Sequence, residues 1–209
     1  MMKNLYLRVI SILIISLFIN VSGFSQGFEG GAMGGLLGSQ VAGDPSSGYN
    51  KLGVYFGILA KRQFTLKSGA QLEMYYIQKG ARENPTEENG FSSYLLRINN
   101  IEIPLLYLFT INEQLQLSVG VAYTYLLGEP NETFNESTSG ISNAGFNKHS
   151  ATFILGIEYY INKQLSVSFR TNNSITPIRP HVSGSTRFFN KGQYSDVLSL
   201  GLVYHFTQI

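Results

Sequence analysis

Apolar and polar residues alternate with a period of two through most of this 209-residue chain. Between Leu115 and Tyr125 every odd-numbered residue is Leu, Val or Tyr, and the even-numbered residues are Gln, Ser, Gly, Ala or Thr. A β-strand places two such sets on opposite faces, whereas a helix would scatter both around its circumference. The same pattern recurs, with more irregularity toward the N-terminus, in seven other segments: 27–38, 50–60, 65–78, 94–109, 151–161, 164–172 and 198–206. The sequence therefore predicts an all-β fold with eight strands.

The connections between these segments alternate in length. Four are long and rich in Gly, Pro, Asn and Ser: 39–49, 79–93, 128–145 and 176–193. Three are short: 61–64, 112–113 and 162–163. Bacterial outer-membrane barrels have an even strand number, short periplasmic turns and long external loops. The pattern indicates an eight-stranded antiparallel up-and-down transmembrane β-barrel in the outer membrane, with four extracellular loops.

The direction of the apolar face separates two kinds of barrel. A barrel in lipid is apolar outside and polar inside, while a soluble lipocalin-like barrel that carries a small apolar ligand is the reverse. The chain has 13 Tyr and 14 Phe, and amphipathic aromatic rings suit a membrane interface. We expect the apolar face to point into lipid and keep the lipocalin-like carrier as the alternative.

The N-terminus has the features of an export signal. Lys3 and Arg8 precede an apolar run from Val9 to Val21, and Gly23-Phe24-Ser25 offers small residues for cleavage. This order is typical of a secretory signal peptide, so we expect a signal over 1–25 and a barrel over 26–209. Two of the 15 Lys and Arg residues leave with the signal, and the remaining 13 balance 13 Asp and Glu. A neutral mature chain argues against nucleic acid as a partner.

Charged residues also occur on the face predicted to line the lumen. We expect a polar lumen network made by five residues: Glu73, Glu102, Glu158, Arg170 and Arg97. An eight-stranded lumen is only wide enough to be filled by side chains, and buried charges have to pair. A plug is therefore favoured over a gated ion path, although a small channel remains the second alternative.

Few residues suit catalysis or metal binding. His149, His181 and Asp196 would have to converge at the outer rim to form an acid–base cluster, and nothing in their spacing singles them out. We interpret them as scattered surface residues and His205 as a lumen hydrogen-bonding group. The chain has no Cys, and its acidic loop residues are better explained by solvation. We expect no enzyme activity, no cofactor and no metal site.

The fourth long loop carries three cations, Arg179, Arg187 and Lys191. They are candidates to meet either lipopolysaccharide phosphates or the acidic loops. The partners expected from the sequence are outer-membrane lipid, lipopolysaccharide and an envelope protein, and the barrel is expected to be a monomer.

Several stretches of the chain resemble the PorT-like outer-membrane β-barrel family of Bacteroidetes-type bacteria. They are 47–53 (SGYNKLG), 76–80 (YIQKG), 100–106 (NIEIPLL) and 197–206 (VLSLGLVYHF). The resemblance implies an outer-membrane location and about eight strands, without a catalytic motif. The family's namesake is linked to protein secretion and gliding machinery. The function expected is a non-enzymatic scaffold whose loops serve envelope integrity, adhesion or docking of a partner, secretion machinery among them.

Overall fold

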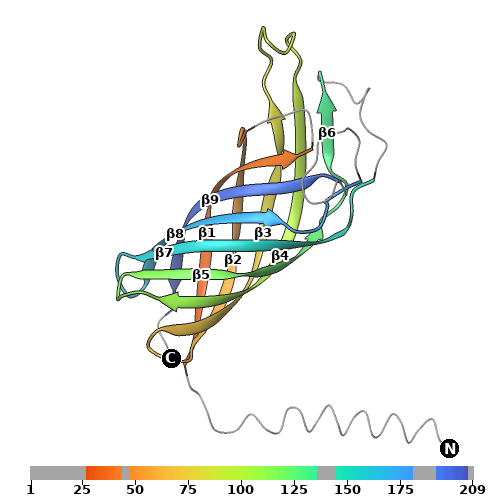
Figure 1. Cartoon of the computed structure of the whole chain (residues 1–209). Helices are drawn as coiled ribbons and strands as arrows, with labels where there is room; N and C mark the ends of the chain where they lie inside the picture. The colour runs from red at the N-terminus through yellow and green to blue at the C-terminus, as the bar shows by residue number, and fades with distance from the viewer. Residues whose placement is uncertain (1–26, 44–47, 136–144, 181–191, 207–209) are drawn as a thin grey trace, which may run out of the picture.

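The computed structural model describes residues 27–43, 48–135, 145–180 and 192–206. Eight long antiparallel strands close into a barrel, because β1 pairs with β9 and β3 pairs with β4 (Figure 1). The barrel strands are β1 Phe28–Ala42, β2 Lys51–Gln63, β3 Ser68–Glu83, β4 Tyr94–Thr110, β5 Leu115–Leu126, β7 His149–Tyr160, β8 Leu165–Ser174 and β9 Tyr194–His205. The predicted fold class is confirmed. No helix in the described ranges is long and apolar enough to cross a membrane.

The predicted alternation decides which way each strand faces. On β2, Leu52 and Phe56 point outward and are 77% and 59% exposed, while Tyr55 between them is 4% exposed. On β9, Leu200 and Leu202 are outward and Ser199 is buried. An apolar exterior around a partly polar interior contradicts the lipocalin-like alternative, which needs an apolar ligand cavity and a polar exterior.

The short connections gather at one end of the barrel, here called the turn end, together with both termini of the described barrel (Figure 1). Two of these turns are built around Asn. The side-chain oxygens of Asn112 and Asn162 accept backbone N–H groups two and three residues later, at 2.8–2.9 Å. Such Asx turns let a chain reverse within a few residues. The long connections lie at the opposite, loop end.

The third long connection contains a strand that the sequence did not predict. β5 stops at Leu126, and Gly128 (φ 66°) and Pro130 break the ladder. The chain then resumes pairing with β4 as β6, Asn131–Phe134. The expectation of an irregular 128–145 connection is corrected for these residues. β6 and the ends of β3 and β4 rise above the loop end (Figure 1).

Pro104 lies inside β4 and lacks the N–H that a strand donates to its neighbour. At such a position we expect a bulge or a missing ladder bond. The pairing of β3 with β4 is interrupted between Leu72–Leu105 and Tyr75–Glu102, and the register is the same on both sides. Pro104 therefore produces no bulge, and the barrel tolerates the gap because β4 stays paired with β5 there.

One side of the lumen is apolar. Eight buried residues of β1, β2, β3 and β9 form a cluster: Met33, Leu37, Tyr55, Leu59, Tyr75, Ile77, Val197 and Val203. Glycine makes room for the rings, since a Cβ on Gly201 would lie 2.3 Å from the Tyr55 hydroxyl oxygen. A smaller apolar cluster of Leu106, Leu108, Ala122 and Ile154 lies on β4, β5 and β7, and polar groups lie between the apolar clusters.

Candidate functional site

Glu102 of β4 is the centre of the polar lumen, and its residue is 0% exposed. Its carboxylate is ion-paired with Lys79 of β3. It also accepts hydrogen bonds from the Tyr75 hydroxyl at 2.7 Å, from Thr124 at 3.1 Å and from Asn172 at 3.2 Å. These donors come from β3, β5 and β8, so a single carboxylate connects three sectors of the barrel wall.

A second buried ion pair crosses the lumen from β8 to β3. Nη1 of Arg170 lies 2.7 Å from Oε2 of Glu73, and both side chains are at most 3% exposed. Arg170 also donates through Nε to the Ser168 hydroxyl at 3.0 Å, and Gln71 donates to the other oxygen of Glu73. The pair holds opposite walls together through the space that a pore would need.

A third group of polar residues fills the turn end of the lumen. Nε2 of His205 lies 2.8 Å from Glu158, and Nδ1 lies 3.0 Å from Glu29, which in turn is 3.9 Å from Lys61. Ser166 lies 3.2 Å from His205, an arrangement reminiscent of a hydrolytic triad. However, Ser166 donates to Glu158 at 2.6 Å, and Ser166 and His205 are 0% and 1% exposed. Because Ser166 has no exposed surface, a substrate cannot reach its hydroxyl.

Four of the five residues predicted for the lumen network face the lumen and are at most 5% exposed: Glu73, Glu102, Glu158 and Arg170. Arg97 does not join them, because its side chain is exposed on the outer face of β4. The expectation for Arg97 is corrected. It shares odd-numbered parity with Ile101 and Ile103, which face outward, and this parity already pointed away from the lumen. Lys79, by contrast, has the same parity as Glu73 and was missed because the predicted strand ended one residue earlier.

The histidines and aspartate considered for a rim cluster have separate partners. His149 of β7 stacks on Tyr123 and hydrogen-bonds to its hydroxyl. Asp196 of β9 accepts from Asn173 at 2.8 Å and from Gln40 at 3.5 Å. His181 lies outside the described residues. Within the described ranges no three His, Asp or Glu residues are placed to hold a metal ion.

The loop end of the lumen is closed by a group of residues that we call the clasp: Arg179, Glu132, Tyr94, Gln193 and Gly43. Arg179 binds both carboxylate oxygens of Glu132, at 2.7 and 2.8 Å. The Tyr94 hydroxyl donates to Glu132 at 2.6 Å. Gln193 accepts from Nε of Arg179 and donates to the Gly43 carbonyl at 2.7 Å. The clasp thus joins the first, third and fourth long connections to the end of β4.

An apolar layer lies beneath the clasp. Buried residues Val41, Ala81, Leu96, Ile98 and Leu126 pack there with Tyr94, and Phe146 and Ile178 lie against them. The Arg179 guanidinium lies over the Phe146 ring, 4.5 Å from its centroid. The cavity below Phe146 and Ile178 has a volume of about 20 Å³, room for roughly one water molecule.

The electrostatics of the clasp follow from its geometry. Burial alone would raise the pKa of Glu132, but hydrogen bonds from Arg179 and Tyr94 hold that pKa below its ordinary value. The same contacts outweigh burial at Arg179 and hold its pKa above the ordinary value. Of the two uses foreseen for Arg179, the structure shows the contact with an acidic loop. Arg187 and Lys191 lie outside the described residues.

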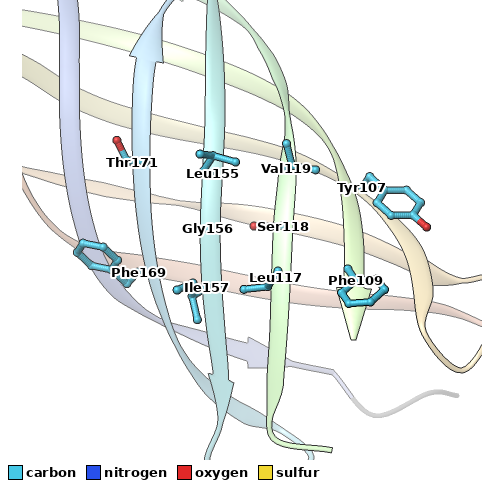
Figure 2. Close-up of a pocket in the computed structure, with 10 residues that line it drawn as sticks. All are labelled: Tyr107, Phe109, Leu117, Ser118, Val119, Leu155, Gly156, Ile157, Phe169 and Thr171. Carbon is cyan, nitrogen blue, oxygen red and sulfur yellow. The ribbon is translucent and has the colours of Figure 1, made fainter. Parts of the chain in front are cut away.

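The outer surface has an apolar groove of about 500 Å³ across β4, β5, β7 and β8. Figure 2 shows Leu117 and Val119 of β5 beside Leu155 and Ile157 of β7, with Ser118 and Gly156 between them. Two aromatic side chains of β4, Tyr107 and Phe109, border it on one side. Rows of aliphatic side chains with an aromatic border form a surface suited to contact with hydrocarbon.

Similar barrels are found among solved structures. Neisserial surface protein A has 12% sequence identity and a TM-score of 0.52, over 87% of this chain and 100% of that one. Ail of Yersinia pestis, solved with the heparin analogue sucrose octasulfate, has 13% identity and a TM-score of 0.48, over 87% and 100%. OprG of Pseudomonas aeruginosa has 14% identity and a TM-score of 0.45, over 86% and 96%. No curated protein matches the chain.

A sequence family supplies the assignment that these distant structures cannot. Residues 22–179 match the family described as the outer membrane protein beta-barrel domain. The match covers most of the chain, and the closed barrel with its apolar exterior agrees with it. The protein is located in the outer membrane, and the chain belongs to the outer membrane protein beta-barrel domain family.

Proposed function

We propose that this protein is a closed, non-enzymatic outer-membrane scaffold that presents its long loops to a partner at the cell surface. The observation that carries the proposal is the occupied lumen, with ion pairs in its middle and the clasp across its loop end. A barrel closed in this way has its outer loops as the surface available for function.

The lumen argues against the small channel. Lys79, Glu102, Glu73 and Arg170 are each at most 3% exposed. A permeating ion would have to separate these pairs in a space without water to replace their partners, and uncompensated buried charge is costly. The cavity of about 20 Å³ under the clasp is far smaller than a hydrated ion requires.

The loop end supports docking of a partner. The clasp ties three of the four long connections to the barrel, so their bases are held in fixed positions. The remaining long connection, between β3 and β4, is carried on the longest strands, of 16 and 17 residues. Binding residues are often found on loops held by a rigid scaffold. Envelope integrity, adhesion and docking to secretion machinery are the roles that this arrangement serves, and the resemblance to PorT-like proteins favours the last.

Conductance measurements test the closed lumen. The purified chain is inserted into planar bilayers, and we expect no unit conductance from the wild type. A folded variant in which Lys79, Glu102, Glu73 and Arg170 are all replaced by Ala is the positive control, because it removes both ion pairs from the middle of the lumen. Heat-modifiable gel migration shows that it has folded. Discrete channel openings from the wild type would refute the closed scaffold.

Complementation of a deletion strain separates the loops from the lumen. One variant replaces the exposed tip of the β3–β4 loop, 86–90, with Gly and Ser. The other, Arg170→Met with Glu73→Leu, replaces a lumen ion pair by apolar groups. We expect the loop variant to lose the wild-type phenotype and the lumen variant to keep it, with both barrels present in the outer membrane. The opposite result would assign the function to the lumen.

A further inference from the structure

The outward face of the barrel changes from apolar to polar at a defined height. On β3 the outward residues run from Leu72 through Met74 and Tyr76 to Gln78. On β4 they run from Ile103 through Ile101 to Asn99. Gln78 and Asn99 are cross-strand partners, and Asn99 accepts hydrogen bonds from Tyr76 at 2.8 Å and from Gln78 at 3.4 Å.

The same change occurs on the other side of the barrel. Thr171 and Asn173 of β8, Asp196 of β9 and Gln40 of β1 form a hydrogen-bonded row on positions of outward parity, in which Asp196 is buried and the other three are partly exposed. Polar groups cannot face the hydrocarbon core without cost. The Gln78–Asn99 pair therefore marks where the apolar part of the membrane ends at the loop end.

Two arginines lie just beyond this boundary, on the outward face. Gly80–Arg97 is the next outward-facing pair after Gln78–Asn99, and Arg82–Leu95 is the one after that. A strand rises about 3.3 Å per residue and tilts about 40° in such barrels, so Arg97 and Arg82 lie about 5 and 10 Å above the boundary. The headgroup layer of a bilayer is about 5–8 Å deep on each side. Arg97 lies within this layer, and the long side chain of Arg82 can extend back into it from just above.

Gly80 adds no side chain beside the two arginines. Gly80, directly opposite Arg97, has a φ of 149°, and a Cβ there would lie 1.8 Å from the Leu96 carbonyl oxygen. Only glycine fits at this position, and Gly80 itself is buried. A groove of about 410 Å³ follows, and Ser93, Asn84 and Thr133 line it together with both arginines. Its polar side chains supply hydrogen-bond donors beside the two cations.

The positive charge of this groove is only partly compensated among the described residues. Arg82 and Arg97 are exposed, and among the described residues neither has an acid within ion-pairing distance. Glu83 also lines the groove and accepts a hydrogen bond from Asn89 at 3.4 Å. Lys51, a buried residue that does not line the groove, adds a third cation close enough to interact electrostatically with both arginines. Three like charges near each other favour an anionic ligand.

We propose that Arg82 and Arg97 bind the phosphate groups of lipopolysaccharide, the glycolipid of the outer leaflet. The guanidinium forks match phosphate oxygens in pairs of hydrogen bonds. The groove lies on the outer wall of the barrel and faces the headgroup layer of the membrane, where the phosphates of the lipid lie at the level of the two arginines. This inference is independent of the closed lumen, since a conducting barrel would present the same outward surface.

Binding of diphosphoryl lipid A to the full-length protein in detergent tests the site. We expect an Arg82→Gln, Arg97→Gln variant to bind about tenfold or more weakly, because two charge-assisted contacts are lost. The matched control is Arg62→Gln. Arg62 is also exposed and outward-facing, but it lies at the turn end beside Phe28. Its substitution leaves the affinity unchanged. Heat-modifiable migration of all three proteins verifies that the barrel has formed.

Two further arms use the wild type alone, so a variant that fails to fold does not decide the question. Lipid A from which the phosphates have been removed is expected to bind at least as weakly as intact lipid A binds to the double variant. Inorganic phosphate at millimolar concentration is expected not to displace intact lipid A. Equal binding of both lipids, displacement by inorganic phosphate, or wild-type affinity in the double variant would each overturn the proposal.

Discussion

Replacing Arg170 by Met breaks the ion pair that spans the lumen from β8 to β3. Arg170 and Glu73 are 3% and 2% exposed as residues, and Nη1 lies 2.7 Å from Oε2. Met fills a similar volume but carries no charge, so the Glu73 carboxylate stays buried, and Gln71 is the one hydrogen-bond donor left to it among the described residues. The substitution therefore tests whether the pair, rather than the packing alone, stabilises the closed lumen.

The expected loss is large because a lone charge remains. Removing one partner of a buried pair costs about 3–5 kcal/mol, which is roughly a 100- to 4,000-fold change in the unfolding constant. In the double variant Arg170→Met, Glu73→Leu no charge is left. Gln71 and Ser168 then each lack one partner, at about 1 kcal/mol apiece. The double variant should be more stable than Arg170→Met alone.

The assay is a urea titration of the barrel in phosphatidylcholine vesicles. Because the chain has no Trp, folding is followed by far-ultraviolet circular dichroism and by gel migration. Lys67→Met, in the exposed β2–β3 turn, is the control and should change the free energy of unfolding by less than about 0.5 kcal/mol. A double variant less stable than Arg170→Met would refute the reasoning, because removing the unpaired charge of Glu73 would then not increase the free energy of unfolding.

Three other perturbations probe different parts of the molecule. Because the pKa of Glu132 is lowered, the Glu132–Arg179 contact stabilises the clasp above the ordinary carboxyl pKa of about 4.3 and is lost as the pH falls through the lowered value. The Gln193 backbone N–H donates to the Arg179 carbonyl at 3.0 Å, and its protection against hydrogen exchange, relative to the intrinsic rate at each pH, should fall over that acidic range. Glu132→Gln should remove this pH dependence. Tyr55→Phe deletes a buried hydroxyl without a hydrogen-bond partner in the described structure, so the urea titration should show unchanged or higher stability; a loss above about 1 kcal/mol would reveal a partner. Leu200→Arg places a charge on the lipid-facing surface and should cost about 2–4 kcal/mol in vesicles, and an unchanged midpoint would place Leu200 outside the hydrocarbon.

The barrel could be predicted because its signals are local. The alternation of apolar and polar residues predicts each strand, and the lengths of the connections predict which end of the barrel carries the turns and which carries the loops. The same parity placed Glu73, Glu102, Glu158 and Arg170 on the inner face. The parity also places Arg97 on the outer face. The prediction that Arg97 lines the lumen was wrong because charged residues were grouped by type, without applying the alternation to each one.

The clasp could not be predicted in the same way. Glu132 and Arg179 are 47 positions apart, and the polar composition of their two connections predicts only that both are loops. Their contact depends on β6 resuming its pairing with β4 after the break at Gly128 and Pro130, and this shift of register has no periodic signal. Contacts between loops depend on the tertiary structure that carries them.

The distribution of charge over the two faces links the fold to the proposed lipid site. Inside the lumen, Lys61, Lys79 and Arg170 each lie within 4 Å of an acid, as burial requires. On the outer face Arg82 and Arg97 have no such partner in the described structure, although Glu83 is nearby. An exposed cation needs no partner for stability in water, but at the edge of the hydrocarbon it loses part of its hydration. Its compensation then has to come from the surroundings, and the anionic groups available at that height are the phosphates of the lipid.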